Sequence, residues 1–473
     1  MYLAKKFLLL LFTGITLAGK TQECDCNKAL DSLKNFIEKN YAGINDKLTP
    51  SAQKAYMDHN ARAKRLAKAA KTEIGCLYTL NAWAKFFRDH HIQVAFSFTP
   101  QKLLQLVAAT ETIKINPAKL KALENTTSSV EGIYYNTDTV YTVALVKSET
   151  GLRHYAAVIL ASKAAEWKKG DVKFEMIRTG NKQFDVIWYN RAHHPSFGSV
   201  SFTGKNGLAE MGWFKENNIV RNTQDPSLVF EEEKTGIVFY KQLDAETGYL
   251  RIRSFGSQFG RIIDSIVHVN DNALHTSPYL IIDLRDNGGG SDFAYDPLRS
   301  LIYTNPVKIV GLDMLATGDN IRAWEKILGD PDLPADTKTI FAEMIEKARR
   351  NKGKLVNIIE DQTDTLKEVL PNPRKIAIII NRKCASTTEQ FLLEALQSNK
   401  VTLFGEQSMG VLDYSNMREK EFFCPAYTLW YATTRSRRID TRQGIDNTGI
   451  QPHVKINLQE IGWLDKVRTA LKK

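Results

Sequence analysis

The stretch KIAIIINRKCASTTEQFLLEALQ, Lys375 to Gln397, predicts a strand, a turn and a helix in direct succession. The run Ile376–Ile380 is apolar and β-branched, which is typical of a buried strand. The helix that follows has an apolar face made of four residues: Phe391, Leu392, Ala395 and Leu396. Ser386 lies at the junction between strand and helix, where backbone N–H groups favour negative charge. A hydrolase places a nucleophile and its oxyanion donors at such a junction.

A structural interpretation of the same segment stays open. Ser386-Thr387-Thr388-Glu389 fits the capping box, Ser/Thr-x-x-Glu, with which many helices begin. A motif is only a hypothesis until its structural context is found. The choice between a helix cap and a nucleophile therefore depends on the rest of the chain.

The composition bounds the class of protein and its partners. The chain has 473 residues, enough for two or three domains with cores of their own. Hydrophobic residues make up 43% of it and charged residues 25%, as expected for a soluble globular protein. The net charge of +11 allows contact with anionic partners. The Lys and Arg residues are spread over the chain, however, and no nucleic-acid motif is present, so we expect a solvated basic surface and no nucleic-acid partner.

The N-terminus predicts export. Lys5 and Lys6 precede the apolar run Phe7–Phe12, which continues from Ile15 to Ala18 and ends in small residues. The run is too short to span a bilayer and has the arrangement of a secretory signal peptide, predicted at residues 1–19. No other segment approaches transmembrane length. The mature protein is therefore expected to be periplasmic or extracellular, without an integral membrane segment.

Five cysteines are present: Cys24, Cys26, Cys76, Cys384 and Cys424. An oxidising compartment permits disulfides, and the odd count leaves at least one thiol free or paired between chains. The spacing of Cys24-Asp25-Cys26 is not that of a zinc site, and no matching pair follows it. We expect neither a metal nor another cofactor.

The pattern along the chain divides it into three parts after the signal peptide. Residues 24–95 are predicted to be a helical region, because apolar residues recur there at helical spacing. Residues 96–235 carry short alternating runs separated by turn residues, which predicts a β-rich middle domain. In residues 236–473 strands alternate with helices, which indicates an α/β core. The stretch 331–371 interrupts this alternation and is predicted to be a helical insertion.

Gly288-Gly289-Gly290 directly follow the predicted buried strand Tyr279–Arg285. Glycine lets a backbone approach a ligand closely and adopt a positive φ, and its N–H groups can face a developing oxyanion. The G-x-G-x-x-G dinucleotide fingerprint is excluded, because Phe293 stands at its last glycine. A plain tight turn is the structural alternative.

Four motifs follow one another in the second half of the chain: LIIDLRDNGGG (Leu280–Gly290), N-x-x-x-A-S-x-x-E (Asn381–Glu389), FGEQSMG (Phe404–Gly410) and GIQPHV (Gly449–Val454). In order and rough spacing, from Gly236 onward, they resemble the C-terminal processing, or tail-specific, serine peptidases. The resemblance implies a mixed α/β fold with a crotonase- and Clp-protease-like core. It also implies that Ser386 is the nucleophile. The amides of Thr387 and Gly289 would form the oxyanion hole, with Gly288 as an alternative donor.

The chain departs from that family at the catalytic base. The processing peptidases use a Ser–Lys dyad with the lysine 25 residues after the serine, and here that position is Val411. A serine near its free pKa is a weak nucleophile and needs a base. Either the protein is a catalytically inactive peptide-binding protein on the same fold, or another residue supplies the base, a relocated lysine included.

A tricorn-like branch of the same superfamily offers such a base. FFRDHHIQV resembles its histidine motif, with His91 at the histidine and His90 as the base if the register differs by one. The stretch D-N-T-G-I-Q-P-H, Asp446–His453, resembles its acidic motif, with Asp446 in place of a glutamate. The resemblance implies a triad of Ser386, His91 and Asp446. A histidine closing a helix and an Asx turn are the structural alternatives for His91 and Asp446.

These expectations combine into one function. We expect an exported serine endopeptidase that hydrolyses peptide bonds in a peptide or protein substrate. His91 would take the proton of Ser386 and deliver it to the leaving amine, while Asp446 would hold the imidazole.

Overall fold

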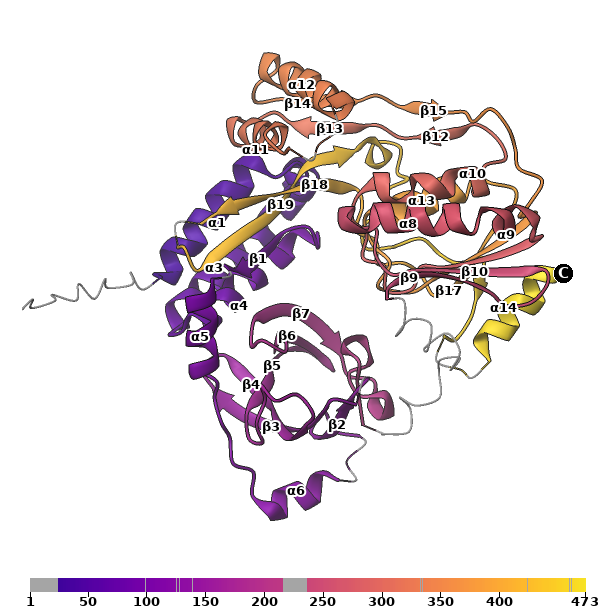
Figure 1. The fold of residues 1–473 in the computed structure, drawn as a ribbon. Helices are drawn as coiled ribbons and strands as arrows, with labels where there is room; N and C mark the ends of the chain where they lie inside the picture. Colours follow the sequence, from indigo (N-terminus) through magenta and orange to yellow (C-terminus); the bar gives the residue numbers. More distant parts are fainter. Residues whose placement is uncertain are drawn as a thin grey trace, which may run out of the picture.

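The computed structural model describes residues 24–215 and 236–473, except for the single residues 98, 125, 127, 138, 332, 334, 423, 459 and 461. The predicted signal peptide lies outside the described residues. Figure 1 shows three parts: N-terminal helices with an antiparallel sheet, a second antiparallel sheet below them, and a layered α/β part that contains the C-terminal helix. The mixed α/β fold expected from the sequence is confirmed.

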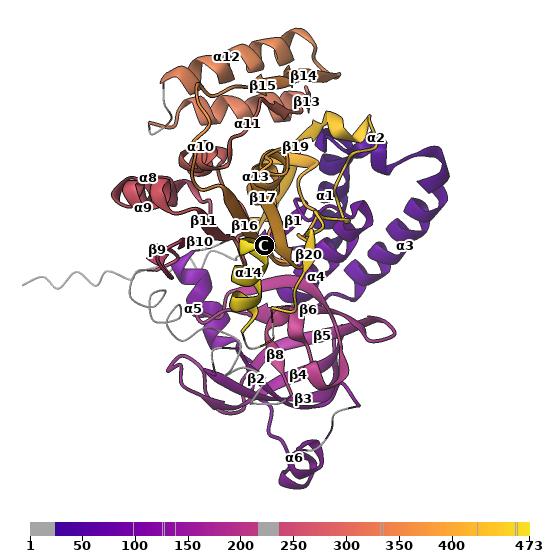
Figure 2. The ribbon, with the colours of Figure 1, turned by 90° about the vertical axis from the view of Figure 1, so that its right-hand side faces the viewer.

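The α/β part is built on a sheet that is parallel except for its edge strand β9. Across the sheet the strands are β20 (Val454–Lys455), β17 (Val401–Gly405), β16 (Lys375–Ile380), β11 (Tyr279–Asp283), β10 (Thr247–Ile252) and β9 (Val238–Gln242). Helices α8 (Ser257–Val269) and α13 (Thr387–Ala395) cover one face, and α14 (Trp463–Lys472) covers the other (Figures 1 and 2). Because both faces are covered, β16 is an almost unbroken apolar run whose residues Ile376–Ile380 are fully buried.

The N-terminal helices pack against a strand hairpin from the other end of the chain. These helices are α1 (Cys26–Asn40), α2 (Ile44–Lys47), α3 (Gln53–Ala69) and α4 (Glu73–Ala84). The sheet beside them has the order β1 (Gln93–Phe96), β19 (Tyr427–Ser436), β13 (Leu312–Leu315) and β14 (Leu355–Ile359), with β18 (Tyr414–Glu421) also paired to β19. One hydrophobic cluster joins the helices to this sheet. Strand β1 runs antiparallel to β19, with Gln93 opposite Trp430, and is not part of the middle sheet.

The middle part is an antiparallel sheet built mostly from hairpins. Its order is β7 (Pro195–Ser201), β6 (Gln183–Tyr189), β5 (Val172–Gly180), β4 (Arg153–Ser162), β3 (Tyr141–Thr150), β2 (Gly132–Asn136) and β8 (Trp213–Phe214). Helices α5 (Pro100–Ala108) and α6 (Pro117–Leu123) precede it. Strand β7 contacts α4, where the rings of Tyr78 and Phe197 lie 6.0 Å apart. The sheet is thus attached to the helical region through the end that carries β7.

The stretch 331–371 contains helix α12 (Ala335–Arg350), then β14 and β15 (Gln362–Asp364). The helix packs beside α11 (Gly318–Leu328), and β15 pairs with β12 (Val307–Ile309). The short helices α9 (Asp271–Thr276) and α10 (Arg299–Ile302) lie in the α/β part. The structure therefore adds strands to the helix expected in this stretch, because their short runs find partners outside it.

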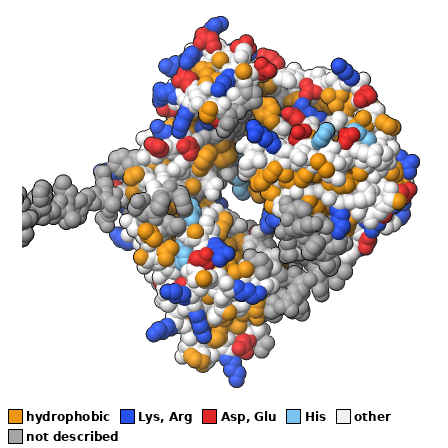
Figure 3. Space-filling view, viewed as in Figure 1, with side chains coloured by type: hydrophobic (Ala, Val, Ile, Leu, Met, Phe, Trp, Pro, Cys, Tyr) orange, Lys and Arg blue, Asp and Glu red, His pale blue; other side chains and the backbone are white. Residues whose placement is uncertain are grey.

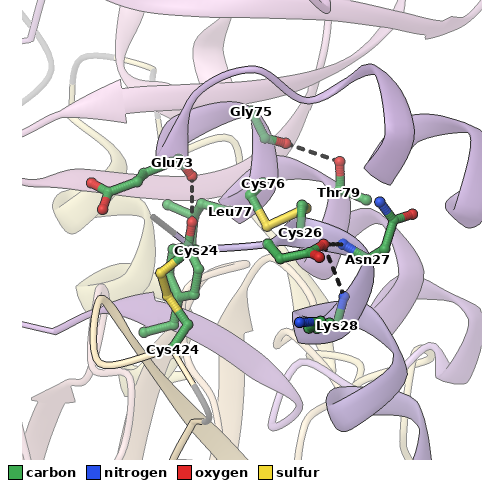
Figure 4. Close-up of a disulfide and its surroundings, with 12 residues drawn as sticks. Cys24, Cys26, Asn27, Lys28, Glu73, Gly75, Cys76, Leu77, Thr79 and Cys424 are labelled. Atoms are coloured by element: carbon green, nitrogen blue, oxygen red, sulfur yellow. Dashed lines mark hydrogen bonds between the residues drawn. A yellow bond between two sulfur atoms is a disulfide. The ribbon is translucent and has the colours of Figure 1, made fainter. Parts of the chain in front are cut away.

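Disulfides fasten the N-terminal helices (Figure 4). Cys24 is bonded to Cys424 and Cys26 to Cys76. The first bond joins the residues before α1 to the connection between β18 and β19, and the second joins α1 to α4. Cys384 is free and buried. Within the described ranges, no helix is both long enough and apolar enough to cross a membrane.

Candidate active site

Ser386 lies between β16 and α13 in a backbone conformation that is rare for a residue with a side chain. Its φ of 56° and ψ of −123° fall outside the regions that L-residues prefer. The capping box is present, since the Ser386 N–H donates to Glu389 Oε2 at 3.2 Å. A cap requires only an extended backbone, however, so capping does not explain the strained conformation. Strain of this kind concentrates at functional sites.

The carboxylate of Glu389 fastens the loop after β17 to this junction. It is fully buried and accepts hydrogen bonds from the Ser408 hydroxyl at 2.5 Å and from the N–H groups of Gly410 and Val411, both at 2.7 Å. The Val411 carbonyl in turn accepts the Ser386 N–H at 3.0 Å. Burial raises the pKa of Glu389, although these hydrogen bonds oppose the rise. Val411 thus contacts the serine through its backbone at the position where the processing peptidases have their lysine.

The glycine turn after β11 lies against the serine. Gly289 has a φ of 96°, and a Cβ atom there would lie 2.9 Å from both Ser386 Cβ and the Thr387 nitrogen. Only glycine fits this approach. The Gly289 N–H already donates to Asn287 Oδ1 at 3.0 Å. The N–H groups of Gly288 and Thr387 have no acceptor among the described residues.

His91 is buried in the turn before β1, with 6% of its surface exposed. Its Nδ1 lies 2.5 Å from the Tyr414 carbonyl oxygen. Because a carbonyl only accepts, Nδ1 is the donor in this contact, and in the neutral ring Nε2 is then the acceptor. Asp89 adds a second restraint, since its Oδ1 accepts the His91 N–H at 2.8 Å and lies 3.9 Å from Nδ1. His90 is exposed, and its ring makes no hydrogen bond within the described part of the chain.

One short segment, residues 411–414, connects the histidine to the serine. The Val411 carbonyl accepts a hydrogen bond from the Ser386 N–H, and the Tyr414 carbonyl accepts one from His91 Nδ1. These carbonyls are three residues apart, which is at most about 10 Å of extended chain. Asp446 binds the middle of the segment, because its Oδ1 accepts the two central N–H groups at 3.0 and 2.8 Å. The three residues of the predicted triad are therefore all attached to this segment.

Asp446 is bonded to backbone and not to the histidine. Among the described residues, the hydrogen bonds to its side chain come from the N–H groups of the 411–414 segment. Its pKa is raised from 3.8 to about 7, first by burial and then by the negative charge of Asp89. Asn447 donates to the Arg88 carbonyl at 2.8 Å, which joins this loop to the histidine segment. Asp89, which contacts His91, is thus also close enough to Asp446 to disfavour its ionised form.

Two carboxylates at the site were not indicated by the motifs. Asp89 is buried, and its Oδ2 has no hydrogen-bond partner among the described residues. Asp413 accepts hydrogen bonds from two backbone N–H groups of the loop that carries Asp446. It also accepts one from the guanidinium of Arg438 at 3.2 Å. Asp89 has a sequence signal, an acid two residues before a candidate base, whereas nothing local distinguishes Asp413. Within the described ranges, no group of His, Cys, Asp and Glu is arranged to hold a metal ion.

Cys384, two residues before Ser386, is fully buried, and its thiol donates to the Leu284 carbonyl at 3.0 Å. Burial raises the pKa of this thiol to about 12. A buried thiol that stays protonated is a packing residue and not a second nucleophile.

Comparison with known proteins gives a family and several resemblances. Residues 246–456 match the model of peptidase family S41. No curated protein matches the chain by sequence. Among solved structures, mature CPAF complexed with lactacystin is 14% identical, with a TM-score of 0.47 over 95% of this chain and 98% of that chain. The photosystem II D1 C-terminal processing protease is 11% identical, with a TM-score of 0.38 over 95% and 98%. The tricorn protease is 12% identical, with a TM-score of 0.39 over 95% of this chain and 36% of that chain.

Proposed function

We propose that this chain is a serine-type peptidase of family S41, whose model matches residues 246–456, with Ser386 as its nucleophile and His91 as its general base. The observation that carries the proposal is the junction itself. A half-buried serine is held in a strained conformation between a buried strand and a helix, and the Thr387 N–H beside it has no acceptor among the described residues. The reaction is the hydrolysis of a peptide bond through a tetrahedral intermediate.

In this proposal His91 takes the proton of the Ser386 hydroxyl through Nε2 and returns it to the leaving amine. The contact between Nδ1 and the Tyr414 carbonyl supports the assignment, because it fixes the tautomer in which Nε2 accepts. His90 has no such restraint and is the weaker candidate. No lysine is required, which separates this mechanism from a Ser–Lys dyad.

Asp446 and Asp89 would stabilise the imidazolium by their charge. Since the hydrogen bonds of Asp446 go to backbone, its proposed role is electrostatic and differs from that of a bonded triad acid. Asp89, through the His91 N–H, would also orient the ring.

The oxyanion would be held by the Thr387 N–H together with an N–H of the glycine turn. Gly289 is closest to the serine, but its N–H must first leave Asn287 Oδ1. The Gly288 N–H needs no such exchange within the described structure. Donors of this kind stabilise the charge that develops in the transition state.

Export completes the proposal. Disulfides persist in oxidising compartments, and four of the five cysteines are paired. This supports a signal peptide at residues 1–19, a periplasmic or extracellular location, and a peptide or protein substrate met there. N-terminal sequencing of the secreted protein is expected to begin near residue 20, and a secreted chain that still begins at Met1 would contradict cleavage.

The decisive experiment is labelling with a fluorophosphonate probe together with hydrolysis of an unfolded protein substrate. We expect the wild type to be labelled and active, and Ser386→Ala to be neither. Ser51→Ala changes an exposed serine that is distant from Ser386 in the sequence; it is the matched control and should behave as the wild type. An unlabelled but folded wild type would favour the inactive peptide-binding alternative.

A further inference from the structure

A cavity of about 370 Å³, lined by charged and polar side chains together with Phe184 and Val200, opens beside the candidate active site. Asp89 and His90 line it on one side, next to His91, and Asn447 lines it next to Asp446. Its opposite wall is formed by β5, β6 and β7 of the middle sheet. The space-filling view shows the molecule hollowed between the N-terminal helices, the middle sheet and the α/β part (Figure 3). The cavity lies between the first two of these parts, next to the segment that carries His91.

The basic residues that line the cavity differ in how they are paired. Lys85 lies 2.5 Å from Asp185 Oδ1 and 2.9 Å from the Ser199 hydroxyl, so its charge is balanced. Arg88 is exposed, and its guanidinium has no ion pair or hydrogen bond within the described part of the chain. The Glu210 carboxylate, also at the cavity, accepts the Ser201 N–H at 3.1 Å. Of the cations Lys85 and Arg88, Arg88 is therefore the one without a partner among the described residues.

The backbone of Arg88 adopts a conformation that is uncommon for a residue with a side chain. Its φ of 48° and ψ of 41° are left-handed, and it closes a short 3₁₀ helix at a position where glycine is the usual residue. Its carbonyl accepts from Asn447, which fixes it next to the loop of Asp446. This hydrogen bond helps to hold Arg88 in a conformation that glycine adopts more easily.

We propose that this cavity is a subsite for an acidic side chain of the polypeptide substrate, bound by the guanidinium of Arg88. The proposal rests on the proposed peptidase function and adds a preference for Asp or Glu near the cleaved bond. A guanidinium presents donors that match a carboxylate in a two-pronged hydrogen bond. Hydroxyl and amide groups of Thr179, Gln183 and Ser201, which line the cavity, complete a polar surround.

The test compares peptide pools that differ only by Glu or Gln at each position flanking the cleaved bond. We expect Glu to raise kcat/KM about fivefold at one position, and the ratio to fall toward one in 1 M NaCl as the charges are screened. Arg88→Gln should bring the ratio to about one, and Arg88→Lys should retain part of it. Arg65→Gln removes the same charge from an exposed site on α3 and should leave the ratio as in the wild type.

Binding of the same pools to Ser386→Ala, followed by fluorescence anisotropy, separates this proposal from the catalytic one. Tighter binding of the Glu peptide, lost in the Ser386→Ala/Arg88→Gln double variant, supports the subsite even if no peptide is cleaved. Equal binding and equal cleavage of Glu and Gln peptides at every position overturns the subsite while leaving the peptidase intact. A Glu preference that survives Arg88→Gln overturns it as well.

Discussion

The part that carries the serine and the part that carries the histidine are built in different ways. Ser386 is positioned by neighbouring parallel strands and the turns that follow them, and each of these strand–turn motifs is a continuous stretch of sequence. His91 is positioned by β1, which pairs with β19, and by the carbonyl of Tyr414. The nucleophile is thus a product of local strand–turn–helix structure, whereas the base is delivered by contacts between distant ends of the chain. Bringing distant parts of the chain together costs more loop-closure entropy than forming contacts between nearer parts. We therefore expect the part that carries His91 to unfold or shift more easily than the part that carries Ser386.

The largest effect is expected from removing the base. His91→Ala should lower kcat by roughly 10⁴–10⁶-fold, because the serine hydroxyl then has no proton acceptor. Fluorophosphonate labelling should be lost in parallel, while the parallel-sheet core stays folded by circular dichroism.

His90→Ala is the matched control for this prediction. It removes an imidazole from the adjacent, exposed position and should leave kcat within a few-fold of the wild type. If His91→Ala keeps its activity, the base is a lysine or another group. If instead His90→Ala is the inactive variant, the register of the histidine motif is wrong by one residue.

A second test acts on the serine side alone. Gly289→Ala places a Cβ within 2.9 Å of Ser386 Cβ and of the Thr387 nitrogen, at a φ of 96°. We expect kcat to fall by about 10²–10³-fold or more, since the oxyanion donors and the serine are displaced together. Gly288→Ala is the control, because a Cβ there meets nothing within 4 Å. Equal activity of the two variants would show that the turn does not shape the site.

The same contrast explains how much of the fold could be predicted. The strand at Lys375–Ile380 and the helix from Thr387 carry their own periodicity, so the sequence indicates both. A four-residue strand such as β1 carries too little pattern to name its partner, and its pairing with β19 depends on the assembled core. The strands in residues 331–371 were missed for the same reason.

For the site, motifs were enough to indicate residues but not their bonds. Ser386 and Gly289 are marked by strand and turn context, and they meet in the structure. The bonding of Asp446 to backbone and the occupied N–H of Gly289 depend on where other side chains run, which no local pattern encodes. Asp413, which shapes the loop of Asp446, is an acid without any local signal.

A third test weakens the histidine side without touching the chemistry. The Cys24→Ala/Cys424→Ala double variant removes the bond between the residues before α1 and the β18–β19 hairpin. Loss of a native disulfide typically lowers the free energy of unfolding by about 2–5 kcal/mol. We expect a lower Tm by calorimetry, and activity that is lost on warming before the parallel sheet unfolds.

The Cys26→Ala/Cys76→Ala double variant serves as its comparison, because that bond joins α1 to α4 within the helical region. It should lower stability without separating the helices from β19. If both double variants lose activity at the same temperature as the α/β part unfolds, the two parts form one cooperative unit and the histidine side is not the weaker one.

The smallest effect is expected at Asp446, where the two parts meet. Its pKa is raised from 3.8 to about 7, so the folded state binds the proton more tightly than the unfolded state. The contribution of Asp446 to the free energy of unfolding must therefore fall as pH rises from about 4 to 7. Asp446→Asn removes this pH-dependent loss and keeps an oxygen for the same N–H groups. The difference in free energy of unfolding between the variant and the wild type should therefore shift in favour of the variant by on the order of 1 kcal/mol from pH 5 to pH 8. Denaturant titrations at both pH values measure the gain, with Asp58→Asn on exposed α3 as the control for one lost charge. A constant difference between variant and wild type at both pH values would mean that Asp446 is already ionised and that Asp89 does not act on it.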